Sequence, residues 1–139
     1  MPVPATVVTP ERVLFDDEVD AVNLRTAEGE AAFLPGHAPL IGSVEPGLVR
    51  LDRSDGTQVR LAVHGGFVHV ENDRVQVLTP VAELADEIDV ERARRAVEAA
   101  EARLAELRGA DAEDPALVEV EAALRRARVR IEVATGATA

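Results

Sequence analysis

The spacing of apolar residues along the chain changes near residue 84. Before that point, apolar and polar positions alternate over short stretches, most clearly in 57–63, where Val59, Leu61 and Val63 share one side of the pattern. A period of two places apolar side chains on one face of a β-strand and polar ones on the other. The same pattern predicts strands at 5–8, 19–24, 31–34, 48–51, 67–70 and 74–78.

Turn-forming residues separate these stretches. The Glu-Asn-Asp tripeptide at 71–73 indicates a hairpin between two predicted strands, because Asn and Asp tolerate the turn backbone. Three prolines between positions 34 and 47 cannot donate backbone hydrogen bonds, so this segment is predicted to be an ordered loop with pieces of edge strand. Short strands separated by such turns predict an antiparallel β-sandwich for residues 1–87.

From residue 88 onward the apolar period is that of a helix. Asp89 is the expected N-cap of a first helix that ends before Gly109, and Asp114-Pro115 is an N-cap followed by proline at the first helical position. The two apolar seams are Val90, Ala93, Val97, Ala100, Leu104 and Leu107, and Leu117, Val120, Leu124, Ala127, Ile131 and Ala134. Because the linker is short, residues 88–139 are predicted to form an antiparallel hairpin of two helices of about 19 residues each.

The composition narrows the classes of function. The chain has 139 residues, a net charge of −11 and 15 basic side chains, all of them arginine. The acidic balance argues against nucleic acid and anionic lipid, which select clustered positive charge. The absence of cysteine and lysine excludes disulfides, thiol nucleophiles, Schiff-base lysines and a phosphate-binding loop that ends in lysine. No apolar run is long enough to span a membrane and no secretory signal is recognisable, so a cytoplasmic protein is expected.

The sequence offers no catalytic constellation. Ser43 and Ser54 lie outside a nucleophile elbow, and the three histidines lack the spacing of metal ligands. Neighbouring acids such as Asp16 and Asp17 are more simply solvated loop charges. We therefore expect neither catalytic residues nor a metal site, and no enzyme activity.

A set of short motifs resembles one known family. Residues 34–40 are LPGHAPL, preceded by EGE at 28–30 and followed by EPG at 45–47, GGF at 65–67 and IDVERA at 88–93. In this order and at these spacings the set resembles the epsilon subunit of the F-type ATP synthase over nearly the whole chain. The resemblance implies a ten-stranded β-sandwich followed by two α-helices, and a non-catalytic subunit of the central rotor stalk.

The resemblance also implies partners. They are the gamma subunit and the ring of membrane c subunits, and the complex couples proton flow and ring rotation to ATP synthesis at the cytoplasmic face of the cell membrane. The subunit itself is not expected to insert into the membrane. Glu30 and His37 match the family positions that face the c ring. From the residues alone, an ordinary sandwich corner in which His37 hydrogen-bonds the backbone is the simpler interpretation.

Arginines are concentrated in the second helix. Arg125, Arg126, Arg128 and Arg130 lie within about one and a half turns. The resemblance implies that they contact the alpha/beta catalytic head when the hairpin extends, and so inhibit ATP hydrolysis. The plainer alternative is surface solubility, with Arg125 paired to Glu121 four residues earlier.

The seams suggest that the hairpin can open. Four of the twelve seam positions are alanine, which buries little, so docking between the helices is expected to be modest. Separation would break this packing and leave the backbone hydrogen bonds of both helices intact. A compact and an extended state are therefore both expected, and a ligand that prefers one shifts the balance.

The IDVERA run also resembles the ATP-binding motif of some bacterial members. On that resemblance, Asp89, Arg92 and Arg126 would hold ATP as a regulatory ligand, and no cofactor is otherwise required. Guanidinium groups suit phosphates, although Asp89 is equally a helix cap and Arg92 a surface residue. A hypothesis of a different class follows, namely a small ATP-sensing module whose hairpin opens without a rotor. Co-purification with gamma distinguishes the two.

Overall fold

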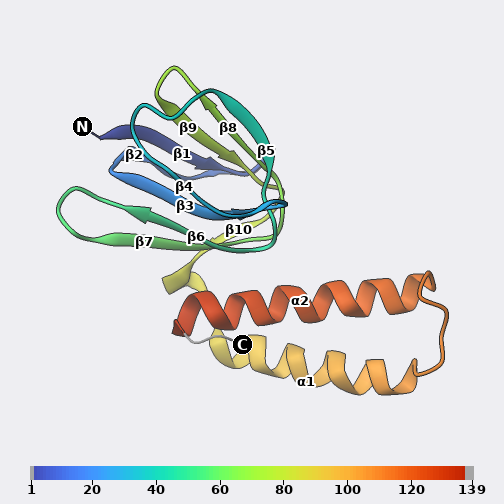
Figure 1. Ribbon diagram of the computed structural model, residues 1–139. Coiled ribbons are helices and arrows are strands. Elements are labelled where there is room, and N and C mark those ends of the chain that lie inside the picture. Colours follow the sequence, from blue (N-terminus) through green and yellow to red (C-terminus); the bar gives the residue numbers. More distant parts are fainter. Residues whose placement is uncertain (1, 137–139) are drawn as a thin grey trace. The chain divides into compact units, whose positions relative to one another are not determined.

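The computed structural model describes residues 2–136. The chain divides into two compact units, Met1–Glu87 and Ile88–Ala139. The first unit consists of β-strands and one short 3-10 helix, η1 (Ala85–Glu87), and the second of two α-helices (Figure 1). The β and α parts follow one another in sequence, which confirms the predicted α+β class.

Two five-stranded sheets form a sandwich in the first unit (Figure 1). Their strand orders are β2-β1-β9-β8-β5 and β10-β7-β6-β3-β4. Neighbouring strands are antiparallel except β1 and β9, which are parallel. The strands are β1 (Val3–Val8), β2 (Val13–Val19), β3 (Ala21–Thr26), β4 (Gly29–Phe33), β5 (Leu40–Ser43), β6 (Gly47–Asp52), β7 (Gln58–Val63), β8 (Phe67–Glu71), β9 (Arg74–Leu78) and β10 (Ala82–Leu84).

Alternating aliphatic residues build the core between the two sheets. In β8 and β9 the inward positions are Val68, Val70, Val75 and Val77, all almost completely buried. Leu51 and Phe33 are among the largest fully buried side chains. Burial of each such side chain contributes roughly 1.5–3 kcal/mol to folding. The alternation of apolar and polar residues along the strands therefore identifies the residues of this core.

The predicted hairpin at residues 71–73 is confirmed. Asn72 and Asp73 form its two-residue turn with φ of 53° and 56°, and Glu71 pairs with Arg74 across the strands. Both residues occupy the left-handed region, which Asn and Asp tolerate better than most side chains. The turn fixes the register of β8 against β9, and therefore which side chains lie next to each other on the outer face.

The prediction of one strand at 19–24 is wrong. The chain turns at Asp20, where β2 ends in one sheet and β3 begins in the other. The sequence pattern missed β2 because it is an edge strand in which only Phe15 and Val19 are buried. Its other positions include three consecutive acids at 16–18, and charged side chains of this kind protect sheet edges from pairing with other chains.

The second unit is an antiparallel hairpin of α1 (Val90–Glu106) and α2 (Pro115–Thr135) (Figure 1). Both predicted N-caps are confirmed. The Asp89 carboxylate accepts a hydrogen bond from the Arg92 backbone N–H at 3.0 Å, and the Asp114 carboxylate accepts one from the Ala116 N–H at 2.9 Å. Each helix therefore satisfies its own first turn. No helix within residues 2–136 is long and apolar enough to cross a membrane.

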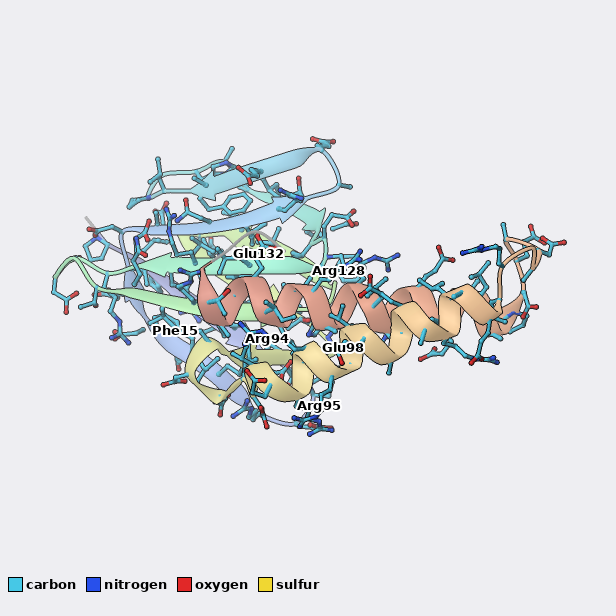
Figure 2. All side chains as sticks on the ribbon, turned by 90° about the horizontal axis from the view of Figure 1, so that it is seen from below. Phe15, Arg94, Arg95, Glu98, Arg128 and Glu132 are labelled. Carbon is cyan, nitrogen blue, oxygen red and sulfur yellow. The ribbon has the colours of Figure 1, made fainter. Side chains whose placement is uncertain are left out.

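Small residues are the most deeply buried part of the seam between the helices. Ala93, Ala100 and Ala127 are buried, whereas the larger seam residues of α1 are only half-buried. Arg128 of α2 also approaches Glu101 of α1 at 3.9 Å, and Figure 2 shows Arg128 on the reddish α2 ribbon. The alanines allow the helices to approach closely but remove little apolar area from water.

An ion pair anchors the last residue of the first unit. The guanidinium of Arg12 donates to both carboxylate oxygens of Glu87, at 3.0 and 2.8 Å. Glu87 also accepts a hydrogen bond from the Leu84 N–H at 3.1 Å. The hydrogen bond from Arg12 is the main cause of a lowered pKa at Glu87, and the same contact raises the pKa of Arg12. The end of the sandwich is thus held just before the chain enters α1.

The unmodified chain is expected to lose thermal stability as the pH falls from about 5 to 3, and we expect Glu87→Gln to make this loss smaller. Because the pKa of Glu87 is lower in the folded state, its contribution is present above its ordinary value of 4.5 and is lost as the pH falls through the lowered value. Thermal unfolding followed by circular dichroism from pH 7 to acid measures this. Glu28→Gln, on an exposed turn, is the control, and equal slopes for Glu87→Gln and the unmodified chain would contradict the prediction.

Candidate functional site

The loop that follows β4 is attached to the core through Phe33. The Phe33 side chain is buried, and its ring meets the ring of His37 edge-on, with centroids 4.9 Å apart at 70°. His37 is exposed, its backbone N–H donates to the Leu34 carbonyl at 3.2 Å, and its Nδ1 lies 2.9 Å from the Ala38 carbonyl. The ring is therefore held in one orientation at the surface.

Glu30 lies at the other end of β4. It is exposed and forms an ion pair with Arg25, its register partner on β3, with a guanidinium nitrogen 3.3 Å from the carboxylate. Phe33, against which His37 packs, is three residue steps further along the strand, about 10 Å away. The structure thus places Glu30 and His37 on the surface at opposite ends of the same strand and not in contact with each other.

Apolar side chains cover part of the outer face of the sheet that contains β5, β8 and β9. Ile41, Phe67 and Leu78 are 73%, 56% and 44% exposed. Phe67 lies opposite Leu78, and Leu78 lies beside Val8 of β1. We call Val8, Ile41, Phe67 and Leu78 the outer patch. Contiguous exposed apolar side chains of this kind mark interaction sites more often than single ones do.

A hollow of about 410 Å³ adjoins the outer patch. Its walls include Pro10, Phe67, Leu78 and Pro80. Gly66 precedes Phe67 where the chain passes close to Leu78. Its φ is 125°, and an added Cβ would lie 2.2 Å from the Leu78 carbonyl oxygen. The second glycine of the GGF motif is therefore required by a close approach of two backbones. The patch combines apolar surface with a concave edge.

The outer patch was not predicted, although the sequence contains a signal for it. In β8 and β9 the inward valines alternate with outward residues, and that outward set contains Phe67 and Leu78 where polar residues are usual. The turn at 72–73 places those two residues opposite each other. Two apolar residues, Phe67 and Leu78, at outward positions of paired strands could have indicated an interface.

The arginines of α2 differ in their surroundings. Arg125 and Arg128 are exposed, and Arg126 lies 3.4 Å from Glu119. The suggested pair of Arg125 with Glu121 is not formed among the residues that the structure describes. These arginines are therefore spread around the helix and do not converge on one point.

The residues suggested for ATP are only partly brought together. Asp89 and Arg92 meet at the start of α1 through the capping hydrogen bond. Arg128 approaches Glu101, so Arg126 is level with residues near 103 of the antiparallel α1, roughly 16 Å along the helix axis from Arg92. ATP binding by this set stays a prediction.

Two family models match consecutive parts of the chain. The model of the ATP synthase delta/epsilon chain, beta-sandwich domain, matches residues 3–85. The model of the ATP synthase delta/epsilon chain, long alpha-helix domain, matches residues 86–135. The chain belongs to the epsilon subunit family of the F-type ATP synthases.

Relatives of this epsilon-family chain support the assignment over most of its length. It is 44% identical to the ATP synthase epsilon chain of Halalkalibacterium halodurans over 92% of this chain and 93% of the relative. It is 49% identical to the one from Desulforudis audaxviator over 72% of each chain. It also resembles a chain in the structure of the Euglena gracilis mitochondrial ATP synthase, described as OSCP, F1 and c-ring, with a TM-score of 0.77 and 27% identity over 89% of this chain and 76% of that one. The chain is therefore a subunit of an ATP synthase complex.

Proposed function

We propose that this epsilon-family chain is a non-catalytic rotor subunit that binds the gamma subunit through the outer patch. The exposure of Phe67, Ile41 and Leu78 on one sheet face carries this proposal. An acidic chain with few aromatic residues gains nothing from leaving one of its three phenylalanines in water unless a partner covers it. Aromatic anchors at the centre of such patches supply most of the binding energy of an interface.

The loop after β4 is the proposed contact with the c ring. His37 is exposed but fixed by Phe33 and by the Ala38 carbonyl, so little side-chain entropy is lost when a partner contacts it. Glu30 forms a weak surface ion pair with Arg25, which a partner can replace at small cost. In this arrangement the subunit lies at the cytoplasmic face of the cell membrane, docked to the ring and not inserted in the bilayer.

The helical hairpin is the proposed inhibitory element. Arg125 and Arg128 are exposed along α2 and can bind carboxylates of the alpha/beta catalytic head when the hairpin extends. The weakly packed seam and the separate N-caps of the two helices support an extended state, since neither helix depends on the other for its first turn.

Ending the chain after Glu87 is expected to leave ATP synthesis coupled and to raise ATP hydrolysis severalfold. The sandwich would keep its rotor contacts, and the element that blocks rotation in the hydrolysis direction would be missing. Membrane vesicles that contain the whole synthase allow both rates to be measured.

The full-length chain with Arg125→Gln and Arg128→Gln is the matched variant for this truncation. It keeps the hairpin and removes only two exposed charges. An intermediate rise in ATP hydrolysis would therefore show that the charges of these two arginines contribute to inhibition. An unchanged hydrolysis rate after truncation would reject the inhibitory role, while the rotor role would still rest on binding to gamma.

A further inference from the structure

The open edge of the sandwich contains a second hollow, of about 430 Å³. It lies between β2 and the segment around β10, which are edge strands of the two different sheets. β10 has three residues and pairs only with positions 61–63 of β7. Within residues 2–136, positions 58–60 of β7 therefore have no strand neighbour on that side, and this leaves space at the edge.

Two arginines line this hollow, and neither forms an ion pair with a carboxylate of the part of the chain that the structure describes. Arg53 and Arg60 are half-buried, and the Nε atom of each is buried with no hydrogen-bond partner. By contrast, the half-buried Arg50 donates to Asp52 at 2.9 Å, and Arg126 lies 3.4 Å from Glu119. The pKa of Asp55 is lowered mainly by a hydrogen bond from Thr57 and less by the charge of Arg53, but the Arg53 and Asp55 side chains form no ion pair. In a chain with 26 acidic side chains, two guanidinium groups that have no ion pair within residues 2–136, each with a buried Nε–H that lacks an acceptor there, point to an anion supplied from outside.

The wall of the hollow also has an aromatic and aliphatic part. The guanidinium carbon of Arg53 lies 5.4 Å from the centroid of the Phe15 ring, a cation–π arrangement that holds this side chain in place. Phe15 is labelled on the ribbon in Figure 2. Leu14 and Val59 add apolar surface, while the exposed Asp86 adds one carboxylate. A ligand thus meets positive charge and apolar surface in the same hollow.

We propose that the hollow binds a small organic phosphate between Arg53 and Arg60. A phosphate has enough oxygens for both guanidinium groups, whereas a single carboxylate has two. Leu14, Phe15 and Val59 receive the apolar part of the ligand, and the volume lies within the range of small-molecule sites. The residues involved belong neither to the outer patch nor to α1 and α2, so the proposal is independent of the proposed rotor role.

Phenyl phosphate is the probe, titrated into the full chain by calorimetry at constant ionic strength. We expect saturable binding, with weaker binding of inorganic phosphate, which lacks the apolar part, and of benzoate, which lacks the third oxygen. Amide chemical shifts in an NMR titration of the unmodified chain should move around Phe15 and Arg60. Either Arg53→Gln or Arg60→Gln should lower the affinity at least tenfold.

Arg74→Gln, a change at an exposed arginine of β9, is the matched control and should keep the affinity. The absence of saturable binding at roughly 10 mM phenyl phosphate would overturn the proposal. Binding that survives both Arg53→Gln and Arg60→Gln, or that is lost in Arg92→Gln instead, would overturn it too. The shift map of the unmodified chain keeps the test decisive if either arginine variant fails to fold.

Discussion

Phe67→Asp is expected to weaken binding to the gamma subunit roughly 30-fold or more, about 2 kcal/mol. Phe67 lies beside Leu78 on the outer patch, and both are about half exposed in the isolated chain. The substitution removes the aromatic anchor and places a charge where the partner would exclude water, and burial of an unpaired charge is costly. The change should therefore act on binding and leave folding largely intact.

Binding assays with immobilised, purified gamma subunit measure this change in affinity directly. Val118→Asp is the matched control, because Val118 is also an apolar residue about half exposed, but it lies on α2 and outside the outer patch. Circular dichroism and thermal unfolding check that both variants fold. Equal affinity of Phe67→Asp and the unmodified chain would show that gamma binds elsewhere.

Gly66→Ala is expected to lower the free energy of unfolding of the sandwich by about 3 kcal/mol or more. The added Cβ would lie 2.2 Å from the Leu78 carbonyl oxygen and 2.9 Å from the Thr79 Cα, so backbone would have to move. The φ of 125° is also unfavourable for any residue with a side chain. Urea unfolding followed by circular dichroism measures the loss.

Gly56→Ala separates the two causes. Gly56 also has positive φ, 89°, but an added Cβ meets no atom within 4 Å. Its loss should be only the backbone cost, about 1–2 kcal/mol. If Gly66→Ala cost no more than Gly56→Ala, the close approach to Leu78 would not be what requires glycine in the GGF motif.

Most of the elements could be predicted from the sequence because local rules decide them. Asp89 and Asp114 cap helices whatever the tertiary structure, and the valines at alternate positions of β8 and β9 have only one way to be buried. The corner at Asp20 could not be predicted, because a strand that changes sheets keeps an apolar pattern across the turn. Val129 and Val133 are likewise buried outside the predicted seam, which a single helical period does not reveal.

The surroundings of individual side chains were less accessible to sequence analysis. A backbone hydrogen bond of His37 was expected from the sequence and is present at Ala38, but the packing of His37 on Phe33 depends on how the loop folds back. Arg60 belongs to the alternating stretch 57–63, and Arg53 lies in the turn that precedes it. Within residues 2–136, the lack of hydrogen-bond partners for their Nε atoms follows from the short length of β10 and the position of β2 in the other sheet, which are properties of the assembled sandwich.

The separate caps of α1 and α2 have a consequence for how the hairpin can be observed. Since each helix keeps its own caps and backbone hydrogen bonds whether or not it touches the other, far-ultraviolet circular dichroism would report nearly the same helix content for the closed and the open hairpin. The difference between the two states is the distance between helices. Spin labels or fluorophores placed on the two helices would detect this rearrangement, which circular dichroism hardly registers.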